Sequence, residues 1–385
     1  MTHFDFDALI DRRETDSDKW DKYKGQDVLP MWVADMDFLS PPCVIEALTK
    51  RVAHGVFGYT NTPSELVEVV LAHVQKDFGW TIQPEWIVWL PGLVCGLNVL
   101  CKTTPEQADE IMTFTPIYPP FLSAPALAGR QLIKLPLQLK GDQWVMDFEA
   151  LEAAITPKTR MILLCNPHNP TGRSWSKLEL LELARLAQKH DLIMGSDDIH
   201  AGLILDTDKH HTPIASLSPE IAARTITLFA PSKTYNIAGL GCSFAVISDP
   251  TLRRRFITAK GRIVPHVNLL AYTAALAAYK EGEPWRLELI DYLRGNRDLL
   301  QDEIASMKGL TIAHVEATYL IWIDARGLGV ENPAQFFEKA GVGLSDGAEF
   351  DAPGFVRLNF GCNREQLKEA LSRMKDALLD LFLPH

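Results

Sequence analysis

The sequence contains no apolar run of the roughly 20 residues that a helix needs to cross a bilayer, so we expect no membrane-spanning segment. It also contains no C-x-x-C pair. Its six cysteines are scattered through mostly apolar segments, at positions 43, 95, 101, 165, 242 and 362. This pattern argues against a zinc site and predicts buried, reduced thiols in a cytoplasmic protein. Because the first residues are polar and acidic rather than basic and apolar, we also expect no export signal.

Basic residues are outnumbered by acidic ones, 38 Lys and Arg against 49 Asp and Glu, for a formal net charge of −11. Phosphate backbones and anionic lipids repel such a chain, so we expect neither nucleic acid nor a membrane as its main partner. One short cluster, Asp206, Asp208, His210 and His211, could supply metal ligands. Its spacing is irregular, so we interpret it as a solvated loop and predict no metal site.

Between Arg224 and Asp249, Lys233 is the only residue with a formal charge at neutral pH. Apolar runs at 226–230 and 243–247 predict two buried strands, and the connection between them carries Lys233. A lysine shielded from water loses its proton more readily, and its neutral amine can form a Schiff base with a carbonyl. The alternative is that Lys233 extends from a loop tip into solvent.

A second unit, from 161 to 196, is predicted to be strand, turn, helix and strand. Ser176 and Glu179 form a capping box at the start of the helix, and the length of the crossover makes the two strands parallel. Asn169 in the turn and Asp197 after the second strand then lie at the same sheet edge, where ligands bind in such folds. Alternatively, Asn169 serves only the turn, Asp197 and Asp198 are solvated, and His200 is a core histidine.

Three further segments carry candidate binding groups. Residues 86–90 predict a strand that leads through Gly92 into a helix, and the free N–H groups at such a helix start suit a phosphate, although many strand-to-helix turns have a glycine. The strand at 110–115 ends in a Pro-rich turn that exposes Tyr118. In the predicted strand FVRLNF, Arg357 is either an edge-strand charge or a fork for a substrate carboxylate.

Beyond residue 250 the predicted pattern changes from alternating strands and helices to mostly helices, which indicates a second domain. We predict an α/β protein with a large domain at 46–284, in which a mostly parallel sheet lies between helices. A smaller α+β domain combines residues 1–45 with 285–385. The segment LPMWVADMDF, residues 29–38, is extended, and its residue types alone indicate no role for it. Thr62 and Glu65 predict a second capping box.

Taken together, seven motifs in this order resemble the fold-type-I pyridoxal-phosphate (PLP) enzymes related to aspartate aminotransferase, over nearly the whole chain. They look specifically like the cystathionine β-lyases, or C–S β-lyases, of the MalY/PatB type. The motifs are PMWVADMDF, FGYT, PGLVCGL, PIYPPF, NPHNPTGR, SDDIH and APSKTYNIAGL. The resemblance implies PLP as cofactor and the aspartate aminotransferase-like fold.

The resemblance also implies roles for individual residues. Lys233 would bind PLP covalently and move the Cα proton, and Asp197 would keep the pyridine nitrogen protonated. Asn169 would bond the ring hydroxyl and Tyr118 would stack on the ring. The phosphate would be held by the backbone of Leu93 and Val94 with the Ser232 hydroxyl, and by Tyr59 of a neighbouring subunit, which implies a homodimer. Arg357 would bind the substrate α-carboxylate.

This chain departs from the wider aminotransferase pattern at three positions. His200 stands where a tyrosine donor is common, and what it bonds is open. Many relatives have a phosphate-binding arginine eight residues after the lysine, where this chain has Gly241. Ala230 replaces a frequent hydroxyl, so Ser232 would carry more of that role.

The resemblance favours β-elimination from a sulfur amino acid such as cystathionine, which would yield homocysteine, pyruvate and ammonia. The residues themselves fit an aminotransferase acting on an amino acid and a 2-oxo acid equally well, because both reactions begin with removal of the same proton. A third possibility is a non-catalytic regulator of the same fold. Such regulators often carry a DNA-binding extension, which we do not expect in this acidic chain.

Overall fold

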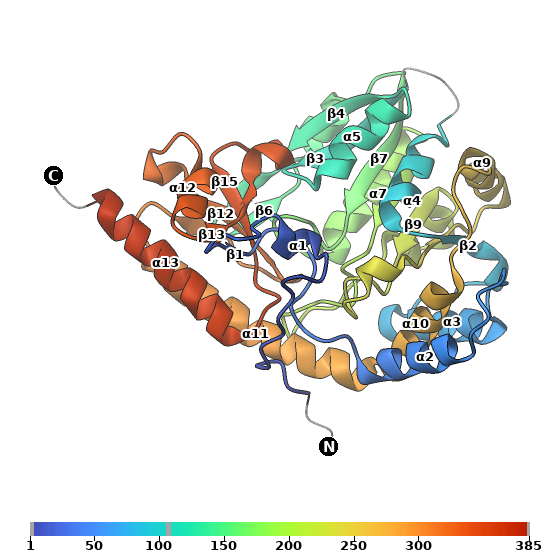
Figure 1. Ribbon diagram of the computed structural model, residues 1–385. Helices are drawn as coiled ribbons and strands as arrows, with labels where there is room; N and C mark the ends of the chain where they lie inside the picture. The colour runs from blue at the N-terminus through green and yellow to red at the C-terminus, as the bar shows by residue number, and fades with distance from the viewer. Residues whose placement is uncertain (1–3, 105–108, 383–385) are drawn as a thin grey trace.

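The computed structural model describes residues 4–104 and 109–382, and its largest element is a mostly parallel sheet (Figure 1). The strands lie in the order β2 (Ile87–Leu90), β10 (Ser243–Val246), β9 (Thr225–Phe229), β8 (Ile193–Asp197), β7 (Thr159–Cys165), β3 (Glu110–Thr115) and β4 (Gln131–Pro136). Pairing is parallel from β9 to β4 and antiparallel at β10 and β2. The strands predicted around Lys233 and Asn169 are confirmed.

Helices cover both faces of this sheet because both faces of its strands are apolar. In β7, Met161, Leu163 and Cys165 contact one apolar core, and Ile162 and Leu164 contact another on the opposite face. The first core is completed by α4 (Leu93–Cys101), α5 (Pro119–Leu127) and α9 (Pro250–Lys260). The second is completed by α6 (Phe148–Ala153) and α7 (Lys177–Lys189). In a third core, α3 (Ser64–Phe78) and α10 (Leu269–Glu281) pack against β2 and β10, and α2 (Pro42–Ala53) packs on α10 (Figure 1).

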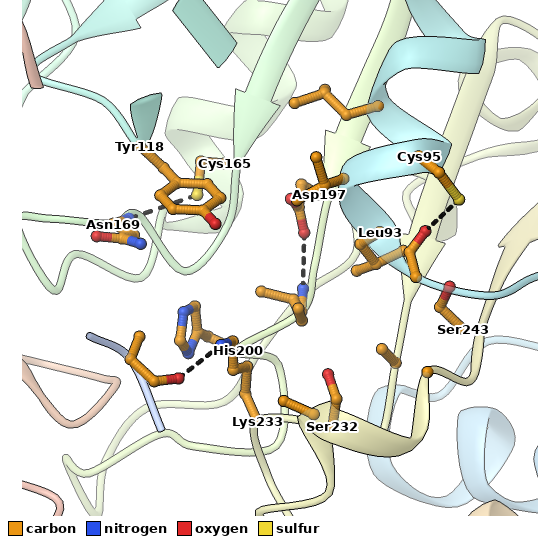
Figure 2. A pocket seen from close by; sticks show the side chains of 18 of the residues that line it. Leu93, Cys95, Tyr118, Cys165, Asn169, Asp197, His200, Ser232, Lys233 and Ser243 are labelled. Atoms are coloured by element: carbon orange, nitrogen blue, oxygen red, sulfur yellow. Dashed lines mark hydrogen bonds between the residues drawn. The ribbon is translucent and has the colours of Figure 1, made fainter. Parts of the chain in front are cut away.

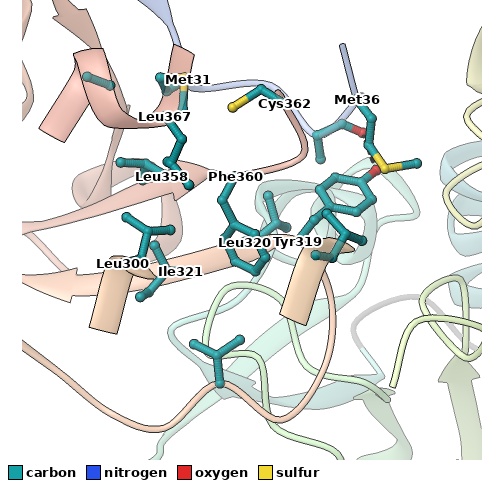
Figure 3. Close-up of a cluster of buried hydrophobic side chains, with 14 of the residues drawn as sticks. Met31, Met36, Leu300, Tyr319, Leu320, Ile321, Leu358, Phe360, Cys362 and Leu367 are labelled. Carbon is teal, nitrogen blue, oxygen red and sulfur yellow. Dashed lines mark hydrogen bonds between the residues drawn. The ribbon is translucent and has the colours of Figure 1, made fainter. Parts of the chain in front are cut away.

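A smaller antiparallel sheet follows in the chain. Its strand order is β11 (Thr311–Ile312), β12 (Leu320–Asp324), β15 (Phe355–Asn359) and β14 (Ser345–Asp346). Three helices pack near it: α11 (Glu283–Ala305), α12 (Pro333–Lys339) and α13 (Arg364–Phe382). Their shared core includes Leu300, Ile321 and Leu367, together with Met31 and Met36 from the N-terminal part of the chain (Figure 3).

The remaining elements are short. They are α1 (Asp18–Asp21), β1 (Leu29–Pro30), which pairs with β13 (Val342–Gly343), the hairpin of β5 (Gln138–Lys140) and β6 (Gln143–Val145), and α8 (Pro219–Ala222). The pairing of β1 with β13 forms a separate two-stranded sheet, which joins the N-terminal segment to the part of the chain that carries the smaller sheet. It supports our proposal that residues 1–45 and 285–385 form one domain and residues 46–284 the other.

One predicted capping box is confirmed and the other is wrong. At the start of α7, Ser176 Oγ accepts the Glu179 N–H at 3.3 Å and the Glu179 carboxylate accepts the Ser176 N–H at 2.8 Å. At the start of α3, Thr62 Oγ donates instead to the Tyr272 hydroxyl at 2.9 Å, and Glu65 pairs with Lys280 at 2.6 Å. Because both partners belong to α10, packing between the helices overrides the local pattern.

The structure also bears on the cysteines, on membrane-spanning helices and on metal sites. The six cysteines are free thiols, four of them buried and Cys43 and Cys95 half-buried. No helix in the described part of the chain is long and apolar enough to span a membrane. Within the same residues no cluster of acidic, His or Cys side chains could hold a metal.

The prediction of a solvated loop at 206–211 is wrong in part. Asp208 and His210 are exposed, but His211 is buried and lies 2.6 Å from Asp198, and Asp206 pairs with Arg297 at 2.6 Å. His211 and Asp206 are therefore held by ion pairs inside the protein and are not solvated.

Candidate active site

The carboxyl ends of β7 and β8, the loop before β10 and the start of α4 surround a cavity of about 280 Å³ (Figure 2). Nine of the ten residues predicted for the site line it: Leu93, Val94, Tyr118, Asn169, Asp197, His200, Ser232, Lys233 and Arg357. The tenth, Tyr59, lies elsewhere. Segments from widely separated parts of the sequence thus meet at the sheet edge where ligands were expected.

Lys233 follows β9, and its amine points into this cavity rather than into bulk water. Nζ donates a hydrogen bond to the backbone oxygen of Ala34 at 2.5 Å (Figure 2). Burial lowers the pKa of Lys233 to about 8. The charge of Asp35 opposes that shift, Arg357 adds to it and Asp197 opposes it more weakly. A substantial neutral fraction at physiological pH makes this amine a competent nucleophile and base.

Asp197 is the last residue of β8 and is buried beside the cavity. Its carboxylate accepts the N–H of Ile199 at 3.1 Å, and within the described residues it forms no salt bridge. Burial raises the pKa of Asp197 to about 7; the Ile199 bond opposes the rise, Asp198 adds to it, and Lys233 lowers the value slightly. A buried carboxylate in this state calls for a cationic partner, which a protonated ring nitrogen would supply.

Arg357 lies in β15, which is an interior strand of the smaller sheet, so the alternative of an edge-strand charge is wrong. Its guanidinium donates to Asn169 Oδ1 at 3.0 Å and to the Trp32 carbonyl at 2.9 Å, and lies over the Phe350 ring at 4.7 Å. Burial lowers the pKa of Arg357 to about 10. In the part of the chain described, no carboxylate pairs with this cation and its Nε has no partner. The site therefore presents a buried positive charge that an anionic ligand would satisfy.

The start of α4 offers backbone donors to the cavity. The N–H groups of the first turn have no partner within a helix, and the first that bonds back is that of Gly96, to the Gly92 carbonyl at 3.2 Å. Leu93 and Val94 therefore present N–H groups where the sequence predicted phosphate binding. Ser232 lies across the cavity with its hydroxyl among the lining groups (Figure 2).

The absence of an arginine at position 241 has a steric explanation. Gly241 has a φ of 68°, and a Cβ at this position would lie 2.6 Å from the carbonyl oxygen of Pro91. No side chain fits there without a shift of the backbone. The charge of a bound phosphate must therefore be met by the helix start, by hydroxyls or by a second subunit.

The remaining lining residues have distinct surroundings. Tyr118 precedes α5 and is half-buried, and burial raises its pKa. His200 packs edge-on against Tyr319 with ring centroids 5.9 Å apart. Burial, reinforced by the charges of Lys233 and Arg357, lowers the pKa of His200 to about 3, so its ring is neutral. Its Nδ1 is buried without a partner among the described residues, which distinguishes it from a satisfied core histidine.

Tyr59 is fully exposed in the connection between α2 and α3, where Val56 and Phe57 are also exposed. It contributes nothing to the cavity of its own chain. This position is compatible with a role across a subunit interface.

Several lining residues were not predicted. Val33 and Ala34 come from the N-terminal segment, whose residue types indicated no role, and Cys95 and Cys165 are thiols next to predicted positions. The motif PMWVADMDF contained a signal for the first pair, since it belongs to the family pattern. The motif PGLVCGL contained the same kind of signal for Cys95, whereas Cys165 lies outside all seven motifs.

The residues present fit PLP on the evidence of their own chemistry. The cavity combines an amine of lowered pKa, a buried carboxylate without a cation and a helix start with free donors. PLP carries a group complementary to each of these. Its aldehyde suits the amine, its pyridine nitrogen suits the carboxylate, and its phosphate suits the helix start.

Comparisons with known proteins agree with this site. The family model for aminotransferase class I and II matches residues 26–374. The cystathionine β-lyase PatB of Bacillus subtilis (strain 168) is 39% identical to this chain, over 97% of this chain and 99% of PatB. The crystal structure of OvoB superposes with a TM-score of 0.96 at 50% identity, covering 97% of this chain and 99% of OvoB.

A third comparison is with the PLP-bound C–S lyase from Staphylococcus hominis, with a TM-score of 0.92, 33% identity and coverage of 98% of this chain and 99% of the lyase. The similarity extends over both sheets and is not confined to the cavity. The chain therefore belongs to the aminotransferase class I and II family, in the branch that contains PatB, and has the aspartate aminotransferase-like fold expected from its sequence.

Proposed function

We propose that this protein is a PLP-dependent carbon–sulfur β-lyase that cleaves cystathionine, or a related cysteine S-conjugate, to a thiol, pyruvate and ammonia. The observation that carries the proposal is that the amine of Lys233, with its lowered pKa, faces one cavity together with Asp197 and Arg357, neither of which forms an ion pair among the described residues. The similarity to PatB and to the C–S lyase of Staphylococcus hominis supports elimination as the reaction.

The chain's own residues would hold the cofactor as follows. Lys233 would bind the aldehyde carbon, and Asp197 would bind the protonated ring nitrogen and keep its charge in place. Asn169 and His200 would bond polar groups of the ring, and Tyr118 would pack on its face. The N–H groups of Leu93 and Val94 and the Ser232 hydroxyl would hold the phosphate. When bound, PLP supplies an acceptor for the electron pair released at the substrate Cα.

Arg357 would bind the substrate α-carboxylate. The bonds to Asn169 and Trp32 and the Phe350 ring fix its guanidinium, so little conformational entropy is lost when a substrate binds. The carboxylate would supply the anion that the buried guanidinium lacks. This contact orients the Cα–H bond relative to Lys233.

The substrate amine would take the place of the Lys233 amine at the aldehyde carbon of the cofactor. The freed Lys233 amine would then remove the Cα proton. Its pKa of about 8 leaves the freed amine able to accept a proton near neutral pH and to give it up again. Loss of the thiol from Cβ then leaves a three-carbon product that hydrolyses to pyruvate and ammonia.

We further propose that the protein is a homodimer in which Tyr59 reaches the phosphate in the neighbouring subunit. The exposure of Tyr59, Phe57 and Val56 supports this arrangement, since an apolar surface of this kind is typical of an interface. The six free thiols support a cytoplasmic location.

An assay that offers the two candidate reactions separately tests the function. The purified protein with PLP is incubated with cystathionine alone, and in parallel with an amino acid plus a 2-oxo acid. We expect pyruvate and free thiol from cystathionine without any acceptor. Strict dependence on the 2-oxo acid would identify an aminotransferase instead, and PLP binding without turnover of either mixture would identify a non-catalytic relative.

A further inference from the structure

The extended segment 31–38, which we call the N-terminal strap, contributes a backbone carbonyl to the wall of the cavity. The strap belongs to no helix or strand, and the carbonyls of residues 32–36 accept hydrogen bonds from side chains. Ala34 lies in the middle of this run and lines the cavity. Asn359 donates to the carbonyls on either side of Ala34, at 2.6 and 2.7 Å, so the backbone is fixed there.

The carbonyl oxygen of Ala34 accepts two hydrogen bonds. Lys233 Nζ donates one at 2.5 Å, and the Tyr319 hydroxyl donates the other at 3.0 Å. A carbonyl oxygen has two lone pairs, so each donor can occupy one of them. Ala34 is 7% exposed, and in the described part of the chain no third donor reaches this oxygen. If the Lys233 amine moves away, Tyr319 is the donor that remains.

Tyr319 is held by its surroundings in the orientation that this bond requires. It directly precedes β12 and is 1% exposed, with its ring in the core that also contains Met36 (Figure 3). The imidazole of His200, which lines the cavity, packs edge-on against this ring. Burial raises the pKa of Tyr319, so the hydroxyl keeps the proton that it donates.

The residue before Tyr319 has a strained backbone. Thr318 has a φ of 75°, in the left-handed region that a β-branched residue rarely adopts. Its N–H donates to the Leu203 carbonyl at 2.9 Å, and its hydroxyl accepts the Leu320 N–H at 3.1 Å. Strain of this kind persists where the surrounding structure imposes it, and it is frequent at functional sites. Here it lies at the bend from which Tyr319 reaches the strap.

We propose that Tyr319 is a positioning residue for Lys233 and acts through the Ala34 carbonyl. The inference rests on the part of the proposed function in which Lys233 binds the aldehyde carbon of PLP. In that step a C=N bond forms, and the aldehyde oxygen leaves as water together with the two hydrogens of the neutral amine. The nitrogen then lacks the hydrogen that it donated to Ala34. Tyr319 keeps the buried carbonyl bonded in that state.

The same arrangement serves the freed amine. Release of Lys233 from the cofactor restores an amine in a buried cavity, where a polar group without a hydrogen bond is costly. The Ala34 carbonyl, held in position by Tyr319, offers this amine an acceptor. Both states of Lys233 therefore leave the carbonyl with at least one donor.

Tyr319→Phe keeps the ring and removes the donor, and two ligands test its effect. PLP binds Lys233 covalently, whereas pyridoxine 5′-phosphate has a hydroxymethyl group in place of the aldehyde and leaves the amine at Ala34. We expect the dissociation constant of PLP to rise about 10-fold in the variant, because attachment then leaves a buried carbonyl without a donor. The constant for pyridoxine 5′-phosphate should change by less than about twofold, because Lys233 still donates. Equilibrium dialysis with PLP-free protein measures both constants.

A matched variant separates this effect from the loss of a buried hydroxyl as such. Tyr23 is also buried and donates to Glu338 at 2.8 Å, and neither residue lines the cavity. Tyr23→Phe should change neither dissociation constant. Equal weakening of both ligands by Tyr319→Phe would indicate a structural role alone and would overturn the inference. Unchanged binding of PLP in that variant would overturn it as well.

Failure of this inference can be told from failure of the proposed function. Borohydride reduction shows in each protein whether PLP is attached to Lys233. Selective weakening of PLP in Tyr319→Phe, without turnover of cystathionine by the unmodified protein, would support the inference and contradict the lyase. Turnover with equal effects on the two ligands would contradict the inference alone. Absence of attachment at Lys233 would overturn both.

Discussion

Arg357 in the smaller sheet donates a hydrogen bond to Oδ1 of Asn169, in the turn after β7 of the larger sheet, across 3.0 Å. The two residues are 188 positions apart in the chain. Each also lines the cavity, so the bond joins the predicted substrate-binding residue to a predicted cofactor-binding residue. The position of one sheet relative to the other therefore sets the geometry of the site.

Replacing Arg357 should selectively impair recognition of the substrate carboxylate. In Arg357→Lys, the planar fork is lost while a positive charge remains, and we expect kcat/KM for cystathionine to fall by about 100-fold. A thioether substrate without the α-carboxylate should be affected far less. Steady-state kinetics with both compounds test this, and an equal loss for the two would contradict the assigned role.

Asp197 should make the stability of the PLP-free protein depend on pH. Its pKa is about 7 in the folded chain and near 3.8 when unfolded, so between these values the folded state binds the proton more tightly. Stability from this group therefore falls as pH rises from 4 to 7, by up to about 4 kcal/mol. Asp197→Asn removes this contribution to the pH dependence of stability. The unfolding free energy of the variant, measured with urea, should therefore increase relative to that of the unmodified protein as the pH rises from 4 to 7. A constant difference would contradict the raised pKa.

Gly241 should not tolerate a side chain. Gly241→Ala places a Cβ 2.6 Å from the Pro91 carbonyl oxygen at a φ of 68°, and we expect a loss of about 2 kcal/mol in unfolding free energy. Gly239→Ala is the control, because nothing lies within 4 Å of a Cβ there. Introducing by Gly241→Arg the arginine that many relatives have should therefore weaken PLP binding rather than improve it. Tighter binding would show that the backbone adapts.

The sequence predicted those parts of the site that depend on local patterns. Parallel strands with a helical crossover bring Asn169 and Asp197 to the same edge, and the lack of charge around Lys233 indicated a shielded amine. Both follow from periodicity and composition within a few dozen residues. The capping box at Ser176 succeeded for the same reason, since Arg173, which also pairs with Glu179, lies only six positions away in the chain.

The expectations that failed depended on contacts between distant segments. Thr62 bonds Tyr272 instead of capping a helix, and His211 lies against Asp198 instead of in solvent. The place of Ala34 beside Lys233 is of the same kind, because 199 residues separate the two. A single sequence read for local patterns contains no measure of such distances.

A buried ion pair between the segment that precedes β12 in the smaller sheet and a turn of the larger sheet should contribute strongly to stability. Glu316, before β12, pairs with Arg173 of the turn after β7 at 2.6 Å and also accepts the Ser174 N–H at 2.8 Å. Glu316→Gln leaves the buried Arg173 charge with less compensation, and we expect a loss of about 3 kcal/mol in unfolding free energy. The control is Glu182→Gln, which breaks an exposed pair with Arg185 and should cost less than about 0.5 kcal/mol. Equal effects in urea unfolding would contradict the importance of the buried pair.

Lys233 is the residue on which the proposed chemistry depends most, because it would bind the cofactor. The protein is reconstituted with PLP, reduced with borohydride, digested and analysed by mass spectrometry to locate the modified lysine. We predict a single site of attachment at Lys233, and loss of both the visible absorbance and turnover in Lys233→Ala. Attachment at another lysine, or full activity in that variant, would contradict the account.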